Sequence, residues 1–115
     1  MKYGLFIIDS AVHGEALVSA WRFAAAALAR GHQIRQVFFY GDAALGLTQP
    51  QPSAIRALDG LAALAAQHGF PLLACQAAAE RLGLHADPQA AVKLGSLGQW
   101  ADALFEMDRI VRFSA

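Results

Sequence analysis

The sequence alternates short apolar runs with longer segments whose apolar residues recur every three to four positions. The runs, which we take as strands, cover residues 3–8, 34–40, 71–75 and 109–113. Continuous apolar runs are typical of strands covered on both faces, and helical segments between them predict parallel strands joined by helices. We therefore expect an α/β fold, a three-layer α/β/α sandwich with a mainly parallel sheet of four to five strands and flavodoxin-like architecture.

Five segments between or after these runs carry helix signals. Gly31 and Gly69 supply natural stops for the two longest helices. The pair Asp87-Pro88 combines an N-cap residue with a proline suited to the first helical position. The expected helices cover residues 14–30, 53–68, 76–82, 87–92 and 96–106.

Size and charge narrow the function classes. A chain of 115 residues with 57% hydrophobic residues has the size of one compact domain, which we expect to span residues 1–115. Nine basic residues balance nine acidic ones, so the sequence offers no basic stripe for direct nucleic-acid binding. An apolar, neutral surface favours burial against other subunits, and we expect a homo- or hetero-oligomer.

The N-terminal sequence and the number of cysteines indicate in which cellular compartment the protein resides. Residues 5–8 are too short a run for a signal peptide, and no apolar stretch approaches a membrane span of about 20 residues. One cysteine cannot form an internal disulfide. We expect a cytoplasmic protein without membrane partners.

The single cysteine, Cys75, lies where the fold predicts function. In open parallel sheets, functional groups gather at the carboxyl ends of the strands. Cys75 ends an expected strand and precedes an expected helix, and the unsatisfied N–H groups of a helix N-terminus favour a thiolate. The alternative is that Cys75 is a small hydrophobic side chain capping an apolar strand, since free cysteine is among the most buried residue types.

Polar residues follow the expected strands at the same sheet edge. His13 follows the first strand and is a candidate proton donor or cationic neighbour of the thiol, although a solvated loop residue is the alternative. Tyr40 and Asp42 follow the second strand, and Gln76 follows Cys75; these are supporting candidates by position. No close-spaced ligand pair such as CxxC or HxxxH occurs, so we expect no metal.

The order of these features resembles the DsrE/TusD family of sulfur-relay proteins over almost the whole chain. Each motif is short, but their order and spacing agree together. The matching stretches are His13-Gly14, residues 21–24, residues 37–40 followed by Asp42, residues 72–79, residues 94–98 and residues 108–113.

The resemblance implies a sulfurtransferase in which Cys75 is a persulfide carrier. It would accept sulfane sulfur from a donor persulfide and pass it to an acceptor protein thiol, in tRNA thiolation or sulfur oxidation, without a cofactor. Relatives of the TusD type work with sister subunits of the same fold. Two alternatives remain open: a non-catalytic assembly subunit of this fold, or a small-ligand-binding α/β module.

Two departures from the family pattern bear on the partners. Residues 83–92 are fewer than in the family, where a longer loop follows the cysteine helix and borders the thiol. Ala43 stands where relatives often carry glycine. A divergent member that forms a homo-oligomer is therefore an alternative to assembly with sister subunits.

Overall fold

A computed structural model describes residues 1–8, 15–41, 43, 52–81, 83 and 91–114 of the chain. Its strands are β1 (Lys2–Ile7), β2 (Gln33–Phe39), β3 (Leu72–Cys75), β4 (Val92–Gly95) and β5 (Arg109–Phe113). Its helices are α1 (Glu15–Ala29), α2 (Pro52–His68), α3 (Gln76–Arg81) and α4 (Leu97–Ala103), and the short 3₁₀ helix η2 (Leu104–Glu106) follows α4.

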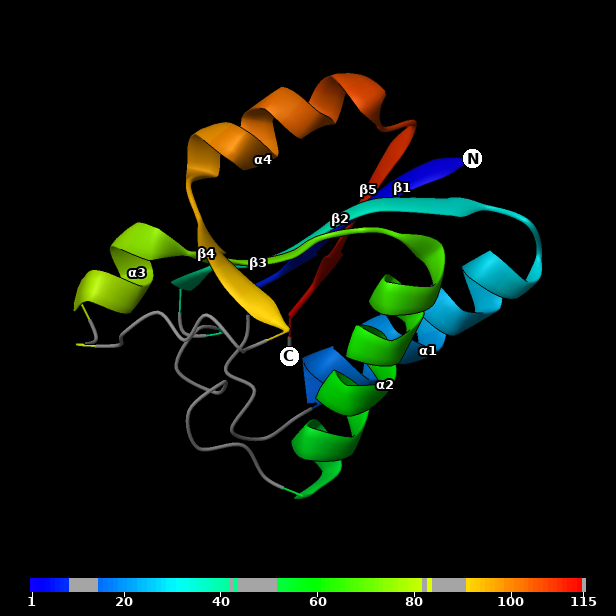
Figure 1. Cartoon of the computed structure of the whole chain (residues 1–115), viewed down its shortest axis with the longest axis horizontal. Coiled ribbons are helices and arrows are strands. Elements are labelled where there is room, and N and C mark those ends of the chain that lie inside the picture. The colour runs from blue at the N-terminus through cyan, green and yellow to red at the C-terminus, as the bar shows by residue number, and fades with distance from the viewer. Residues whose placement is uncertain (9–14, 42, 44–51, 82, 84–90, 115) are drawn as a thin grey trace.

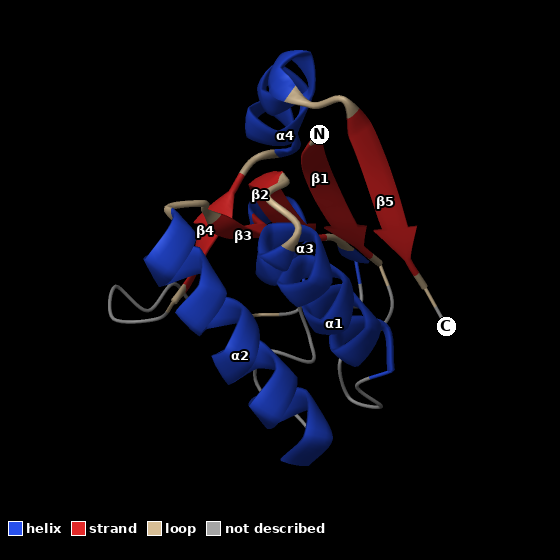
Figure 2. Cartoon of the chain, turned by 90° about the vertical axis from the view of Figure 1, so that its right-hand side faces the viewer, coloured by secondary structure: helices blue, strands red, loops and turns tan. Residues whose placement is uncertain are grey.

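The five strands form one sheet in the order β4-β3-β2-β1-β5, and all four pairings are parallel. Figure 2 shows β1 and β5 running side by side in the same direction. In Figure 1, α1 and α2 lie together on one side of the sheet and α4 lies on the other. The predicted α/β/α sandwich is confirmed, with five strands.

The α1 and α2 layer covers most of the buried core. On α1, buried residues recur at helical spacing, which explains why this alanine-rich segment folds as a helix against the sheet. The two helices approach closely where Trp21 of α1 lies against Gly60 of α2. A Cβ atom at Gly60 would overlap the indole, so glycine permits this contact.

Helix α1 ends just before Gly31, the residue that the sequence indicated as its stop. Gly31 adopts φ +85°, a conformation that side chains disfavour. Its N–H donates to the Leu28 carbonyl at 3.1 Å, and the N–H of His32 donates to the Ala27 carbonyl at 3.0 Å. This pair of bonds is a Schellman motif, and it ends the helix at the predicted glycine.

The opposite layer is thinner and rich in aromatic residues. Trp100 of α4 is 7% exposed, and its ring centroid lies 5.2 Å from that of Phe6 and 5.8 Å from that of Phe38. Gly4 lies below this layer, where a Cβ atom would overlap the sulfur of Met107. Helix α4, through Trp100, therefore covers the centre of this face.

The prediction failed around residue 92. We expected a helix over residues 87–92, but Val92 begins β4, which pairs with β3; residues 87–90 lie outside the described part of the chain. Residues 92–95, which include Lys93, show no clear hydrophobic period. The Asp87-Pro88 pair, which is typical of a helix start, therefore decided the prediction. Pairing with a neighbouring strand decides the structure of so short a segment.

The expected last helix, residues 96–106, is divided into α4 and η2. Ser96 is the N-cap of α4: its Oγ accepts a hydrogen bond from the Gln99 N–H at 3.1 Å, and Gln99 Oε1 accepts one from the Ser96 N–H at 2.7 Å. This capping box fixes the start of the helix. None of the described helices is long and apolar enough to cross a membrane.

Candidate functional site

Cys75 is the last residue of β3 and directly precedes α3, as the sequence predicted. It is a free cysteine and only 4% exposed. Its side chain belongs to the cluster on the α4 side of the sheet. The other buried members of that cluster are Phe38, Leu73, Ala78 and Trp100.

The start of α4 lies beside the thiol, and sequence reasoning missed this. Cys75 pairs with Gly95 of β4, and the next residue, Ser96, caps α4. A Cβ atom at Gly95 would come within 2.9 Å of Gln99 Oε1, so a side chain there would disturb the capping box. Cys75 therefore lies where two helices begin. The pattern of Ser96 followed three residues later by glutamine was the available signal.

Tyr40 directly follows β2, the strand next to β3. Phe39 pairs with Ala74, so Tyr40 and Cys75 each come directly after this last paired position, at the carboxyl edge of the sheet. The Tyr40 ring is 37% exposed and stacks on Phe6, with centroids 5.6 Å apart. The structure thus places this candidate at the same edge of the sheet as the thiol, with its ring against Phe6 of β1.

Of the three remaining candidate residues, the structure describes one, Gln76. Gln76 is exposed, and its Nε2 donates to Glu80 Oε1 at 3.3 Å, so this hydrogen bond runs along α3. His13 and Asp42 lie outside the described residues, and their roles stay predictions. Within the described part of the chain, no three His, Cys, Asp or Glu side chains are grouped so that they could hold a metal ion.

A hollow of about 490 Å³ opens on the same side of the sheet as Cys75. We call it the thiol-side hollow. Arg112 of β5 pairs with Phe6 of β1, so both side chains face the α4 side. The hollow is lined by Phe6, Ile8, Tyr40, Gly41 and Arg112.

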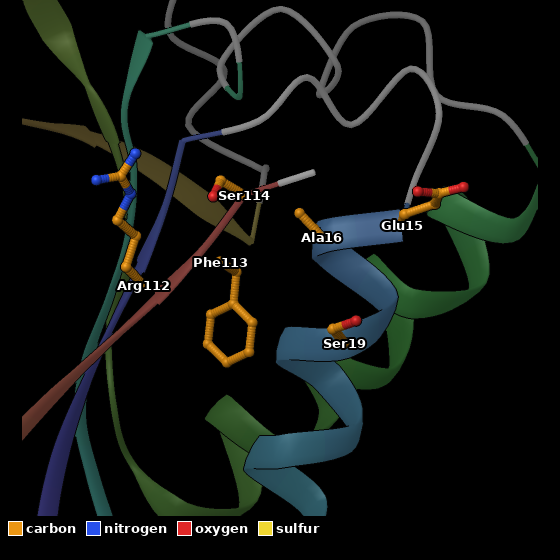
Figure 3. A pocket seen from close by; sticks show the side chains of 6 residues that line it. All are labelled: Glu15, Ala16, Ser19, Arg112, Phe113 and Ser114. Carbon is orange, nitrogen blue, oxygen red and sulfur yellow. The ribbon is translucent and has the colours of Figure 1, made fainter.

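A second hollow, of about 260 Å³, lies between α1 and β5. Figure 3 shows the Phe113 ring pointing towards α1, where its centroid lies 5.9 Å from that of Phe23, while Arg112 points the other way. Glu15 and Ser19 of α1 form part of its wall, and Arg112, which also lines the thiol-side hollow, belongs to its lining. The sheet separates this hollow from Cys75, so the two hollows are on different faces.

The chain matches a known protein family over nearly its whole length. The model of the DsrE/DsrF-like family matches residues 1–113. The chain belongs to this family.

Named members of the DsrE/DsrF-like family are similar over nearly the full chain. The sulfurtransferase TusD of Serratia proteamaculans is 34% identical over 98% of this chain and 99% of the relative. The putative sulfurtransferase DsrE of Allochromatium vinosum is 33% identical over 98% of each chain. Both alignments span 128 residues, more than the 115 of this chain, so these relatives carry residues that this chain lacks.

A solved structure supports the fold independently. The crystal structure of the YchN protein of E. coli superposes with a TM-score of 0.73 and covers 98% of this chain and all of that one. The two sequences are 19% identical, so the likeness concerns the fold. The DsrE-like architecture expected from the sequence is confirmed.

Proposed function

We propose that this chain is a sulfurtransferase of an intracellular sulfur relay, with Cys75 as its persulfide carrier. The observation that carries the proposal is the position of the only cysteine, at the carboxyl end of β3 and directly before α3, in a chain whose relatives are named sulfurtransferases. The carboxyl edge of a parallel sheet is where such folds place their reactive groups. Donor and acceptor proteins are the expected partners, in the cytoplasm.

The exchange needs one nucleophilic sulfur and no cofactor. The Cys75 thiolate attacks the outer sulfur of a donor persulfide, a new S–S bond forms, and the donor's inner sulfur leaves as a thiolate. The reverse roles apply when an acceptor thiolate attacks the outer sulfur held on Cys75. The first N–H groups of α3 lack partners within the helix and lie next to this sulfur in the chain, where they can donate to an anion.

The test is intact-mass measurement after incubation with a cysteine desulfurase, cysteine and pyridoxal phosphate. We expect wild type to gain the mass of one sulfur atom, removable by a reductant, and Cys75→Ser to gain none. A Cys75→Ser protein that gains the same mass would refute the role of Cys75. Circular dichroism of both proteins controls for loss of fold in the variant.

A second candidate function is a non-catalytic assembly subunit of the same fold. The observation that favours it is the 4% exposure of Cys75, which is typical of a structural thiol. It predicts that the native thiol resists alkylation by iodoacetamide while the unfolded thiol reacts fast. Slow alkylation combined with no gain of sulfur would favour this function over transfer, and fast alkylation would exclude it.

We further propose that the chain assembles with copies of itself or with sister subunits. Large apolar side chains are exposed around α4 and β5: Phe105 is 93% exposed, Ile110 51% and Leu97 48%. Exposed large apolar side chains favour association. Light scattering on the purified chain, alone and with candidate sister subunits, gives the mass of the assembly.

A further inference from the structure

The last turns of α2 and the start of β3 leave an apolar hollow of about 280 Å³ between them. We call it the α2 hollow. The buried side chains of Phe70 and Leu72 line it, together with three alanines of α2, Ala62, Ala65 and Ala66. Because alanine side chains are short, the hollow stays open to an apolar group that enters from outside.

Phe105 of η2 is a large apolar side chain that its own chain leaves almost wholly in water. It is 93% exposed, more than any other large apolar side chain of the described residues. η2 leads into β5 at one end of the sheet order β4-β3-β2-β1-β5, whereas the α2 hollow lies at β3 and β4, toward the other end. The phenyl group of Phe105 therefore does not fill the hollow of its own chain.

We infer that Phe105 of one copy inserts into the α2 hollow of a second copy of this chain. The inference rests on the proposed assembly of the chain and names the two surfaces that meet. Since the chain carries both surfaces, each copy can give its phenyl group to one neighbour and receive one from another. Such head-to-tail contacts build a closed ring or an open row of chains rather than a two-fold dimer.

The size of the α2 hollow fits a phenyl group. An apolar cavity of about 150 Å³ is large enough to bind benzene. The α2 hollow is larger than this, so it has room for the side chain of Phe105. The insertion removes apolar surface of both copies from water, which favours the contact.

Charge favours this contact over one between two Phe105 side chains. Asp102 and Glu106 are exposed and flank Phe105 in the sequence. Two copies that met through Phe105 would bring these carboxylates together, and like charges across an interface are unfavourable. The α2 hollow offers the opposite charge, since Lys93 is the only charged residue among the described residues that line it. An ammonium group has three N–H donors, so Lys93 can bind a carboxylate of the neighbouring copy in addition to a contact within its own chain.

Two substitutions remove the two halves of the contact one at a time. Phe105→Ser removes the phenyl group, and Ala66→Trp places an indole at the α2 hollow from an exposed position of its lining. By sedimentation equilibrium, we expect each to weaken association by about tenfold to a hundredfold, the loss of one buried phenylalanine side chain. Ala63→Trp is the matched control, because Ala63 is exposed on the same helix and does not line the hollow. It should leave association unchanged, and circular dichroism confirms the fold of all three variants.

Mixing the two variants tests whether these two surfaces bind each other. The Phe105→Ser protein keeps its hollow and the Ala66→Trp protein keeps its phenyl group, so one working contact remains between them. We expect each variant alone to have the mass of one chain and an equal mixture to have the mass of two. Wild type, which keeps both surfaces, should form assemblies of more than two chains.

The outcomes separate this inference from the proposed function. Association of Ala66→Trp as strong as that of wild type, or a mixture that stays monomeric, would overturn the inference; if wild type still assembles, the proposed assembly stands and uses another surface. Monomeric wild type at all concentrations would refute both self-assembly and the inference. The carrier function is tested separately by the gain of sulfur at Cys75, so its failure in a protein whose variants assemble as expected would leave the contact supported.

Discussion

The two faces of the sheet are packed differently. On the α1 and α2 face, fully buried aliphatic side chains such as Leu5, Ile7 and Leu61 form a continuous core. On the α4 face, a smaller cluster rich in aromatic residues buries Cys75, and Tyr40 and Arg112 are exposed on the same face. We therefore expect the α1 and α2 face to contribute more to stability than the α4 face, on which Cys75 lies.

The largest expected effect compares one substitution on both faces. Leu61→Ala removes a leucine that is 0% exposed on α2 and should lower the free energy of unfolding by about 2–5 kcal/mol. Leu104→Ala removes a half-buried leucine next to the α4 cluster and should cost about 1 kcal/mol, because part of its surface is already in water. Urea denaturation of wild type and both variants measures the two losses.

The denaturant slope serves as a control, since equal slopes mean that the unfolded states expose comparable surface. A loss at Leu104 as large as that at Leu61 would show that the α4 face contributes to stability as much as the other face. The division between the faces would then be wrong.

The second comparison concerns Gly60 of α2 and Gly98 of α4, two glycines whose helices lie on opposite faces of the sheet. Gly60→Ala should destabilise the protein by about 1–3 kcal/mol, because the added methyl overlaps the Trp21 indole and the helices must move apart. Gly98→Ala on α4 should stabilise it by about 0.5 kcal/mol through helix propensity, since the new Cβ would lie 3.5 Å from Ser96 Oγ in ordinary contact. Thermal unfolding of the two variants measures whether each substitution lowers or raises the stability of the protein.

The expected loss of stability in Gly60→Ala depends on how easily the Trp21 indole can move. A stabilising Gly60→Ala would mean that the indole moves aside at little cost and that the contact between α1 and α2 is loose. Fluorescence of a Trp100→Phe background reports Trp21 alone, because the chain has two tryptophans.

The sequence predicted one face better than the other, for a physical reason. The segments that form α1 and α2 bury a full stripe of side chains, so their period and their glycine stops are visible locally. On the other face, β4 is four residues long and exists because it pairs with β3, a contact that no local pattern shows. The same limit explains the division of residues 96–106 into α4 and η2.

The candidate site shows the same limit. Cys75 and Tyr40 were predictable because each stands at the end of an apolar run, and parallel strands bring such ends to one edge. Arg112 was missed because it faces the hollow only through the pairing of β5 with β1, over a hundred residues apart in sequence. The sequence predicted that a helix begins at Ser96, but the position of Gly95 and Ser96 beside Cys75 was missed together with β4.

The smallest expected effect on stability tests what the α4 face does outside the monomer. Phe105 is 93% exposed on η2, so Phe105→Ser should change the free energy of unfolding of the isolated chain by less than about 0.5 kcal/mol. If this face associates with other subunits, the same change should lower the assembled mass seen by light scattering, because a large apolar side chain is lost from the contact. Arg109→Leu, which adds apolar surface on the neighbouring strand, controls for a general effect of surface substitution. An unchanged mass in both variants would place the contact elsewhere, whereas dissociation by Phe105→Ser would mean that assembly uses the side of the sheet on which Cys75 lies.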